Sequence, residues 1–308
     1  MASVLNTNMA SITAQRYLTT AQNKLQTSYE KLSSGSRINR AQDDAAGMGI
    51  SQKLVASINS TSMAIRNAND AIGAAQTAEG AMAEISSMLQ RFKELAVQGG
   101  NEALSGTQRG FLVGEMVQLR SEMLQVAQRT KFNGNPLLAN GGTTGTTTAL
   151  TATLKFQTSE SIDTTTTPTS GFQEVAVYNL AAHGGLATLL DSTEASFVGT
   201  NFTNYTALGT ADYSEFTGAT FTGAIDSAID FIASKRASYG SLINRLNANV
   251  NNLTALHENL SAANSRVVDT DYANETASLT KTQILQQAAT AMLSQANAAP
   301  NVVLALLK

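Results

Sequence analysis

Two adjacent carboxylates are the first residues whose types and spacing could do chemistry. Asp43 and Asp44 lie in the stretch LSSGSRINRAQDDAAGMGISQKL, between arginines and glycines. Such a pair could bind a divalent cation or act as an acid and a base, but a cation site needs further oxygen ligands at fixed spacing. The neighbouring residues offer only amides and hydroxyls. This favours a turn before a helix, where carboxylates stabilise the positive end of the helix dipole.

Few other residues are candidates for chemistry. His183 lies in the turn AAHGGL, His257 occupies a heptad position, and Asp269 and Asp271 lie in a predicted helix break, where they suit capping. The HExxH, GxSxG and GxxxxGK(S/T) signatures do not occur. With no cysteine, disulfides and thiolate metal sites are excluded. We therefore predict a protein that is not an enzyme and has no cofactor and no metal site.

Composition and charge narrow the class of protein further. The 308 residues carry a net charge of −3, which gives no basic surface for nucleic acid. Hydrophobic residues make up 43% of the chain and aromatic residues only 6%, which favours closely spaced helices. No apolar run approaches the roughly 20 residues of a membrane span. The first residues also lack the basic and apolar regions of a cleavable signal peptide.

Periodic apolar residues predict long helices in two zones, 1–131 and 223–308. A helix from about Ala45 to Gln98 is roughly 80 Å long at 1.5 Å per residue. Its heptad spacing is typical of a coiled coil, and the GGNEALSGTQ stretch ends it. The expected coiled-coil seam residues are Ile58, Ile65, Ile72, Leu112, Leu119, Ile225, Ile232, Leu246 and Leu253.

The zone between the helices, about 140–222, is poor in charge and rich in threonine. TTGTTTALTATLKFQT and FQEVAVYNL carry alternating and β-branched patterns and could pair as strands. We expect a small exposed β/loop module there. The predicted fold is mainly α, a long antiparallel helical coiled-coil bundle formed by both termini with this small central insertion. Heptads alone allow many coiled coils, adhesive or receptor-binding proteins among them.

Motifs at both ends of the chain resemble those of bacterial flagellins. LSSGSRINRAQDDAAGMGIS is similar to the family segment LSSGxRINxAxDDAAGxxI, and RTKFNGNPLL to its (T/Q)xFNGxxLL turn. LINRLNANVNNL, SRVVDTDYANETASLTKTQILQQAATAMLSQAN and VLALLK resemble the C-terminal helices and terminus. The resemblance covers roughly residues 1–138 and 223–308. AAPNVV departs from it, since flagellins commonly carry a Pro-Gln pair there.

The resemblance implies a division into domains. We expect an inner-tube helix and spoke over 1–44, a second helical domain built from 45–139 and 223–268, a variable surface region over 140–222, and a C-terminal inner-tube helix over 269–308. The spoke residues are Gly35, Arg37, Asp43, Asp44 and Gly47.

The resemblance also implies that the terminal helices become ordered on assembly. This fits helices that are weakly charged and whose apolar stripes are sparse. The residues expected to pack in the inner tube, against one another and against neighbouring subunits, are Leu5, Ile12, Leu18, Leu25, Leu285, Met292, Val303 and Leu306.

Partners and location follow from the resemblance as well. It implies a secreted subunit that self-assembles into the extracellular flagellar filament for motility, exported through the flagellar type III apparatus with a chaperone on its C-terminal segment. Filament cap and hook-junction proteins are further expected partners. LQRFKELAVQ resembles the patch recognised by the flagellin-sensing toll-like receptor, whose matching residues are Leu89, Gln90, Arg91, Leu95 and Gln98.

Two alternatives within this group stay open. A hook-filament junction protein shares the helical ends, but the intact DDAAG and VLALLK favour a filament subunit. A metalloprotease insert in the variable region is disfavoured by the absence of HExxH.

Overall fold

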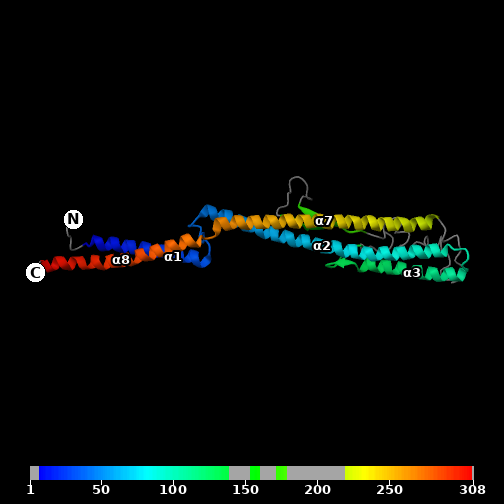
Figure 1. The fold of residues 1–308 in the computed structure, drawn as a ribbon, viewed down its shortest axis with the longest axis horizontal. Coiled ribbons are helices and arrows are strands. Elements are labelled where there is room, and N and C mark those ends of the chain that lie inside the picture. Colours follow the sequence, from blue (N-terminus) through cyan, green and yellow to red (C-terminus); the bar gives the residue numbers. More distant parts are fainter. Residues whose placement is uncertain (1–6, 139–152, 160–170, 179–218, 307–308) are drawn as a thin grey trace. The chain divides into compact units, whose positions relative to one another are not determined.

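The computed structural model describes residues 7–138, 153–159, 171–178 and 219–306 and is mainly helical, as the sequence predicts (Figure 1). Two short antiparallel hairpins accompany the helices. The elements are α1 (Met9–Ser34), α2 (Ala45–Gly99), α3 (Gly106–Arg129), β1 (Lys131–Phe132), β2 (Asn135–Pro136), β3 (Thr153–Gln157), β4 (Phe172–Ala176), α7 (Ala219–Val268) and α8 (Tyr272–Leu306).

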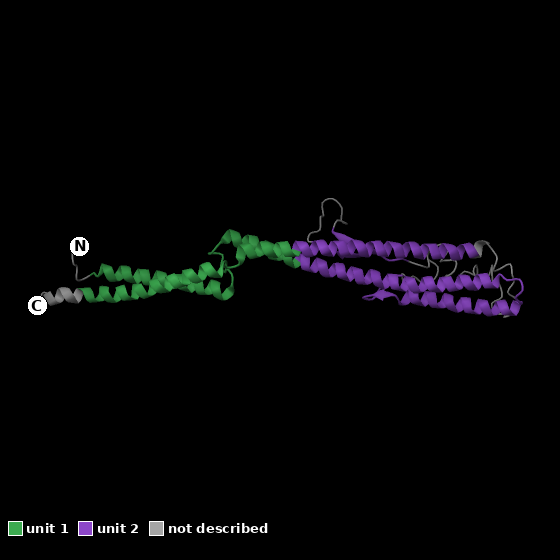
Figure 2. Cartoon of the chain, viewed as in Figure 1, with its two compact units in different colours: residues 1–59, 257–308 green, residues 60–256 purple. Residues whose placement is uncertain are grey.

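The chain divides into two compact units (Figure 2). Unit 1 comprises Met1–Asn59 and His257–Lys308, and unit 2 comprises Ser60–Leu256. The division therefore falls inside α2 and α7. The domain boundaries predicted from the sequence follow the helix ends instead, near residues 44 and 268, and stay a prediction.

Unit 2 has one hydrophobic core, to which α2, α3 and α7 all contribute. Alanine fills the first part of the α2 face, since Ala68, Ala71 and Ala75 are fully buried. Larger side chains take over towards the end of α2. The buried core residues include Met82, Ile85, Leu89 and Phe92 of α2, Val113, Met116 and Met123 of α3, and Ile225, Ile232, Leu246 and Leu253 of α7.

The expected seam residues of α2 and α3 lie beside these central positions. Ile58, Ile65, Ile72, Leu112 and Leu119 are only half-buried. On α2 the central positions belong to alanine because a short side chain lets two helices approach closely, and the isoleucines then pack at the margins of the contact.

Enlarging one of these alanines should therefore destabilise unit 2. We expect Ala75→Leu to lower the free energy of unfolding by about 1–3 kcal/mol, since added methylenes in a filled core force the neighbouring helix away. Urea unfolding followed by circular dichroism measures this. Gln76→Leu is the matched control, because Gln76 is exposed and should shift stability by less than about 0.5 kcal/mol. Equal effects of both changes would contradict the packing described here.

Ion pairs between helices set their alignment in unit 2. Arg236 Nη2 of α7 lies 2.8 Å from Glu79 Oε1 of α2, and Lys93 Nζ of α2 lies 2.5 Å from Asp226 Oδ1 of α7. The order of these contacts along the two helices is antiparallel. Because the partners are largely exposed, each pair stabilises by only about 0–1 kcal/mol and serves mainly to fix the register.

The turn between α2 and α3 is closed by side chains. The Ser105 hydroxyl accepts from the Gln108 backbone N–H, and the Gln108 side chain accepts from the Ser105 N–H, which makes a capping box. Buried Arg109 donates from Nε to the Gly99 carbonyl at 3.1 Å and from Nη2 to the Asn101 carbonyl at 3.0 Å. These bonds satisfy carbonyls that the end of α2 leaves without helical partners.

The hairpin of β1 and β2 turns through two residues with positive φ. Asn133 has φ 49° and Gly134 has φ 81°, as the tight two-residue turns of antiparallel hairpins require. The chain then returns into the core, where Leu137 and Leu138 are fully buried.

The second hairpin confirms the two predicted strands but not their predicted exposure to solvent. β3 pairs antiparallel with β4, and Lys155 faces Glu174 across the pair. Val175 and Val177 are buried, and the Tyr239 hydroxyl of α7 donates to the Ala176 carbonyl at 2.5 Å. The prediction of an exposed module is therefore wrong for the described strands, because their apolar face packs on the core of unit 2.

Candidate functional site

The paired carboxylates form a turn that leads into α2. Asp44 Oδ1 accepts from the Gly47 N–H at 2.9 Å and so caps the helix. Asp43 Oδ2 accepts from the backbone N–H groups of Arg40 and Asn39 at 3.0 and 3.1 Å. These two bonds hold the pKa of Asp43 below its ordinary value, because they favour the charged carboxylate. The pair is engaged with the backbone, as a turn requires.

The connection after α1 is tied to the connection before α8. Gly35 ends α1 with φ 72°, and its carbonyl accepts from the Thr270 N–H at 2.9 Å. The Arg37 N–H donates to the Val268 carbonyl at 2.6 Å, and its Nη2 donates to the Val267 carbonyl at 2.6 Å. The spoke residues Gly35 and Arg37 thus join the two ends of the chain within unit 1.

The other polar residues singled out in the sequence have structural roles or lie outside the described residues. Asp271 Oδ1 accepts from the Ala273 and Asn274 N–H groups at the start of α8, and the Asn274 backbone bond is the main reason that its pKa is lowered. His257 is half-buried on α7, and His183 lies outside the described residues. No three His, Cys, Asp or Glu side chains in the described ranges are grouped to hold a metal ion. Within those ranges, no helix is long and apolar enough to cross a membrane.

Gly47 and Gly49 offer a matched test of this turn. A Cβ at position 47 would lie 2.7 Å from Ile38 Cδ1 and closer still to the Asp44 carboxylate, whereas a Cβ at position 49 would meet nothing within 4 Å. We expect Gly47→Ala to destabilise the start of α2 by about 1–3 kcal/mol, and Gly49→Ala to stabilise it by about 0.5–1 kcal/mol. Amide hydrogen exchange over residues 45–51 measures both. Protection that changes in the same direction in the two variants would contradict this account.

In unit 1, α1 and α8 lie side by side along their length (Figure 1). The pair is antiparallel, since Asn8 near one end donates to the Ala296 carbonyl and Tyr272 near the other donates to the Leu32 carbonyl. The fully buried seam positions are Ala14, Ala21 and Ser28 of α1 and Thr282 and Ala296 of α8. The half-buried positions between them are Ser11, Leu18, Leu25 and Leu32 of α1 and Leu279, Gln286, Ala289 and Leu293 of α8.

This seam corrects part of the predicted inner-tube packing. Leu18 and Leu25 lie on it, but Ile12, Leu285 and Met292 are 52%, 51% and 64% exposed. The seam positions of α8 are Gln286 and Leu293, each one residue after the predicted Leu285 and Met292. This side of the helix also carries small side chains, which fit closest to α1. Leu5 and the side chains of Val303 and Leu306 lie outside the described residues.

Apolar side chains consequently cover an outward face of α8. Ile284, Leu285 and Met292 are each more than half exposed, and Ala288 lies between them on the same face. We call these four residues the α8 apolar face. A third face of the helix is polar and exposed, with Gln287, Thr290 and Ser294.

Charged residues are sparse around this face, and Lys281, one turn before Leu285, is the nearest along α8. From residue 282 to residue 307 the sequence contains no Asp, Glu, Lys or Arg, and the first 15 residues of the chain contain none either. A weakly charged helix with an exposed apolar face is typical of a surface that another protein surface covers. The sequence analysis assigned Leu285 and Met292 to packing within the chain and against neighbouring subunits but did not separate them as an exposed face, and their packing against neighbouring subunits stays a prediction.

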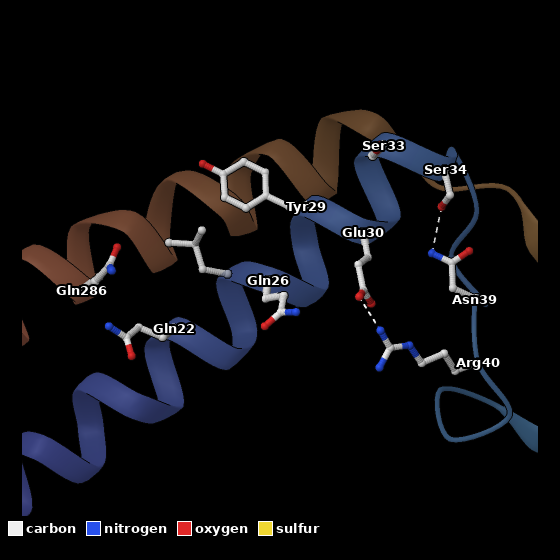
Figure 3. A pocket seen from close by; sticks show the side chains of 10 residues that line it. Gln22, Gln26, Tyr29, Glu30, Ser33, Ser34, Asn39, Arg40 and Gln286 are labelled. Carbon is white, nitrogen blue, oxygen red and sulfur yellow. Dashed lines mark hydrogen bonds and ion pairs between the residues drawn. The ribbon is translucent and has the colours of Figure 1, made fainter.

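An open groove of about 650 Å³ lies beside the seam, between α1, the connection after it and α8 (Figure 3). Leu25 and Tyr29 give it an apolar part, and Gln22, Gln26 and Gln286 supply amides. At its other end Glu30 pairs with Arg40, and the Asn39 amide donates to the Ser34 hydroxyl at 2.8 Å. The lining suits contact with a protein surface rather than acid–base chemistry, because the carboxylate is already paired.

The predicted receptor patch is only partly at the surface. Leu89 and Leu95 are buried in the unit-2 core, at 0% and 1% exposure, so the prediction that they contact a receptor is wrong for this folded chain. Gln90, Arg91 and Gln98 are exposed. Arg91 bonds to Glu115 at 2.9 Å and to Glu94 at 3.1 Å, and these bonds raise its pKa.

Both helical ends of the chain match sequences of known proteins. The bacterial flagellin N-terminal helical region matches residues 5–143, and the bacterial flagellin C-terminal helical region matches residues 222–307. Flagellin C of Vibrio cholerae is 35% identical and polar flagellin F of Vibrio parahaemolyticus 34% identical, each over 376 aligned positions that cover 100% of both chains. A crystal structure of Bacillus cereus flagellin is 27% identical, with a TM-score of 0.42, and covers 65% of this chain and 94% of that one. The chain belongs to the bacterial flagellin family, a family of structural proteins and not of enzymes.

Proposed function

We propose that this chain is a structural subunit that polymerises with copies of itself into the extracellular filament of the bacterial flagellum. Family membership gives the class of assembly. The observation that carries the proposal is the α8 apolar face, exposed on a helix pair whose most buried seam positions hold small side chains and whose leucines are only half-buried.

The energetic argument starts from that seam. Two paired helices that bury mainly alanine, serine and threonine gain little from the hydrophobic effect. Full burial of a large apolar side chain is worth about 1.5–3 kcal/mol, and covering the exposed half of one adds roughly half of that. Copies of the chain that cover Ile284, Leu285 and Met292 therefore supply stabilisation that the α1–α8 pair lacks, and few charged groups have to be desolvated there.

The arrangement also favours an open polymer. Met9 and Ile12 are exposed on α1, on the side away from its seam, and the α8 apolar face belongs to the other helix. A contact between two different surfaces of the same chain is heterologous, and repeating it gives a ring or an open helical filament. A filament is the form that matches the family.

Further partners are proposed from the family alone. They are the flagellar type III export apparatus, a chaperone on the C-terminal segment, the filament cap and the hook-junction proteins. For the flagellin-sensing toll-like receptor, we retain Gln90, Arg91 and Gln98 as contacts, since these are the exposed members of the matching segment.

Seeded growth tests the proposal. Purified full-length chain is added to short filament fragments at neutral pH, and lengths are measured by negative-stain electron microscopy. The control is a chain that ends after Asp269 and so lacks α8. Growth of the full chain and no growth of the truncated one supports a filament subunit. A full chain that binds the ends of seeds and stops their growth contradicts it and indicates a junction protein.

A further inference from the structure

The methionines of the chain differ sharply in their access to water. Met82, Met116 and Met123 are at most 2% exposed, whereas Met9, Met63 and Met292 are 61%, 47% and 64% exposed. Oxidation of a thioether requires contact with an oxidant in solution, so exposed methionines react first. The exposed ones are therefore the candidates for modification.

Of these exposed methionines, Met292 is the one whose oxidation should change a contact surface most. It lies on the α8 apolar face with Leu285 and Ile284, in a segment without any charged residue. A sulfoxide converts this flexible apolar side chain into a polar one with a strong hydrogen-bond acceptor. One turn before Met292 this face presents Ala288, and one turn after it lies the exposed Gln295, whose amide is the nearest possible donor along the helix.

We propose that Met292 is a redox modification site whose oxidation by peroxide in the free subunit blocks addition of that subunit to the polymer. The proposal rests on the proposed function, because it takes the α8 apolar face to be covered on assembly. In the reaction, a sulfur lone pair attacks one peroxide oxygen and the O–O bond breaks. An S–O bond forms and water leaves. The sulfur loses two electrons and the peroxide is reduced, so no other reactant is needed.

The experiment uses the wild-type chain and an internal control. Free subunit is treated with hydrogen peroxide until fewer than one methionine per chain is oxidised on average, and catalase then removes the peroxide. The pool is allowed to extend isotopically labelled seeds made from untreated chain. Filaments are pelleted, and peptide mass spectrometry compares the sulfoxide fraction at each methionine in the newly added subunits and in the supernatant.

We expect sulfoxide at Met292 to be about tenfold or more enriched in the supernatant, since burying a strongly polar oxygen in place of a thioether disfavours addition. The reference is Met63, which is exposed on α2 outside this face, and its sulfoxide should partition nearly equally. Equal partition at Met292, or exclusion of Met63 sulfoxide to the same degree, overturns the proposal. Failure of the untreated chain to extend seeds instead overturns the proposed function.

Repair gives a second readout. Treating the supernatant with methionine sulfoxide reductases for both epimers should restore its addition to seeds. Supernatant chains that regain methionine at position 292 and still fail to add would show that other damage is responsible, which also overturns the proposal.

Discussion

We expect replacement of Leu285 by glutamate to weaken polymerisation strongly, while the free subunit stays folded. Leu285 is 51% exposed, so the isolated chain loses little when it changes. In the polymer, however, the carboxylate would be covered by a neighbour, and even a pair with Lys281, one turn earlier on α8, would not offset the cost of taking both charges out of water. We expect the critical concentration for growth to rise about 100-fold or more, which corresponds to about 2.8 kcal/mol. Sedimentation of polymer against total protein measures it.

The control for this substitution lies two residues away. Gln287→Glu introduces the same charge on the exposed polar face of α8, and we expect it to change the critical concentration less than about tenfold. Leu285→Met, which nearly conserves volume, should also preserve growth. If Gln287→Glu and Leu285→Glu are equally harmful, the effect belongs to charge on α8 in general, and the α8 apolar face has no special role.

The second large effect is expected at Tyr239, in unit 2. This side chain is 1% exposed, its ring packs edge-on against Tyr178 with centroids 5.6 Å apart, and its hydroxyl bonds to the Ala176 carbonyl. Tyr239→Ala should lower the free energy of unfolding by about 3–5 kcal/mol, because it leaves a cavity between α7 and the hairpin of β3 and β4. Tyr239→Phe keeps the ring and should cost about 1 kcal/mol for the lost hydrogen bond.

Urea unfolding of the free chain separates these contributions. Phe111→Ala is the matched control, since Phe111 is 64% exposed and should change stability by less than about 0.5 kcal/mol. Burial raises the pKa of the Tyr239 hydroxyl above its ordinary value of 10.0, so the hydrogen bond should persist at moderately alkaline pH. Tyr239→Ala with a stability equal to that of Phe111→Ala would contradict the anchoring role.

The sequence predicted the long helices well because their signals are local. The break after α2 contains two adjacent glycines, and the capping residues of α3 and α8 stand at the helix starts. The alternation of β3 and β4 likewise predicted strands. Each of these signals depends on a few neighbouring residues, so no knowledge of tertiary contacts was needed.

The sequence predicted poorly which side of α8 packs on α1, and the reason is physical. Two apolar stripes run along this helix, one through Leu285 and Met292 and one through Leu279 and Leu293. Periodicity alone chose the wrong stripe, because Leu285 and Met292 are seven residues apart, whereas Leu279 and Leu293 are fourteen apart with Gln286 between them. Which stripe of α8 faces α1 depends on which one lies beside small residues that fit against Ala21 of α1. That fit depends on both helices together and cannot be read from α8 alone. Burial of the hairpin similarly depends on Tyr239, far away in the sequence.

Hydrogen bonds join the connection after α1 to the connection before α8, and they determine how freely the sequence of these two connections can vary. Two of these bonds run from backbone to backbone, Arg37 N–H to Val268 and Thr270 N–H to Gly35. Nearly every amino acid supplies these groups at positions 37, 268 and 270, so side chains there can change without loosening the two bonds. Gly35 is the exception, because its φ of 72° favours glycine and an added Cβ would lie 3.1 Å from the Tyr272 hydroxyl. The Thr270 hydroxyl is buried and has no hydrogen-bond partner among the described residues, so valine, of the same shape, should be readily accepted at that position. Proline at position 37 or 270 lacks the N–H and would remove one of the two bonds.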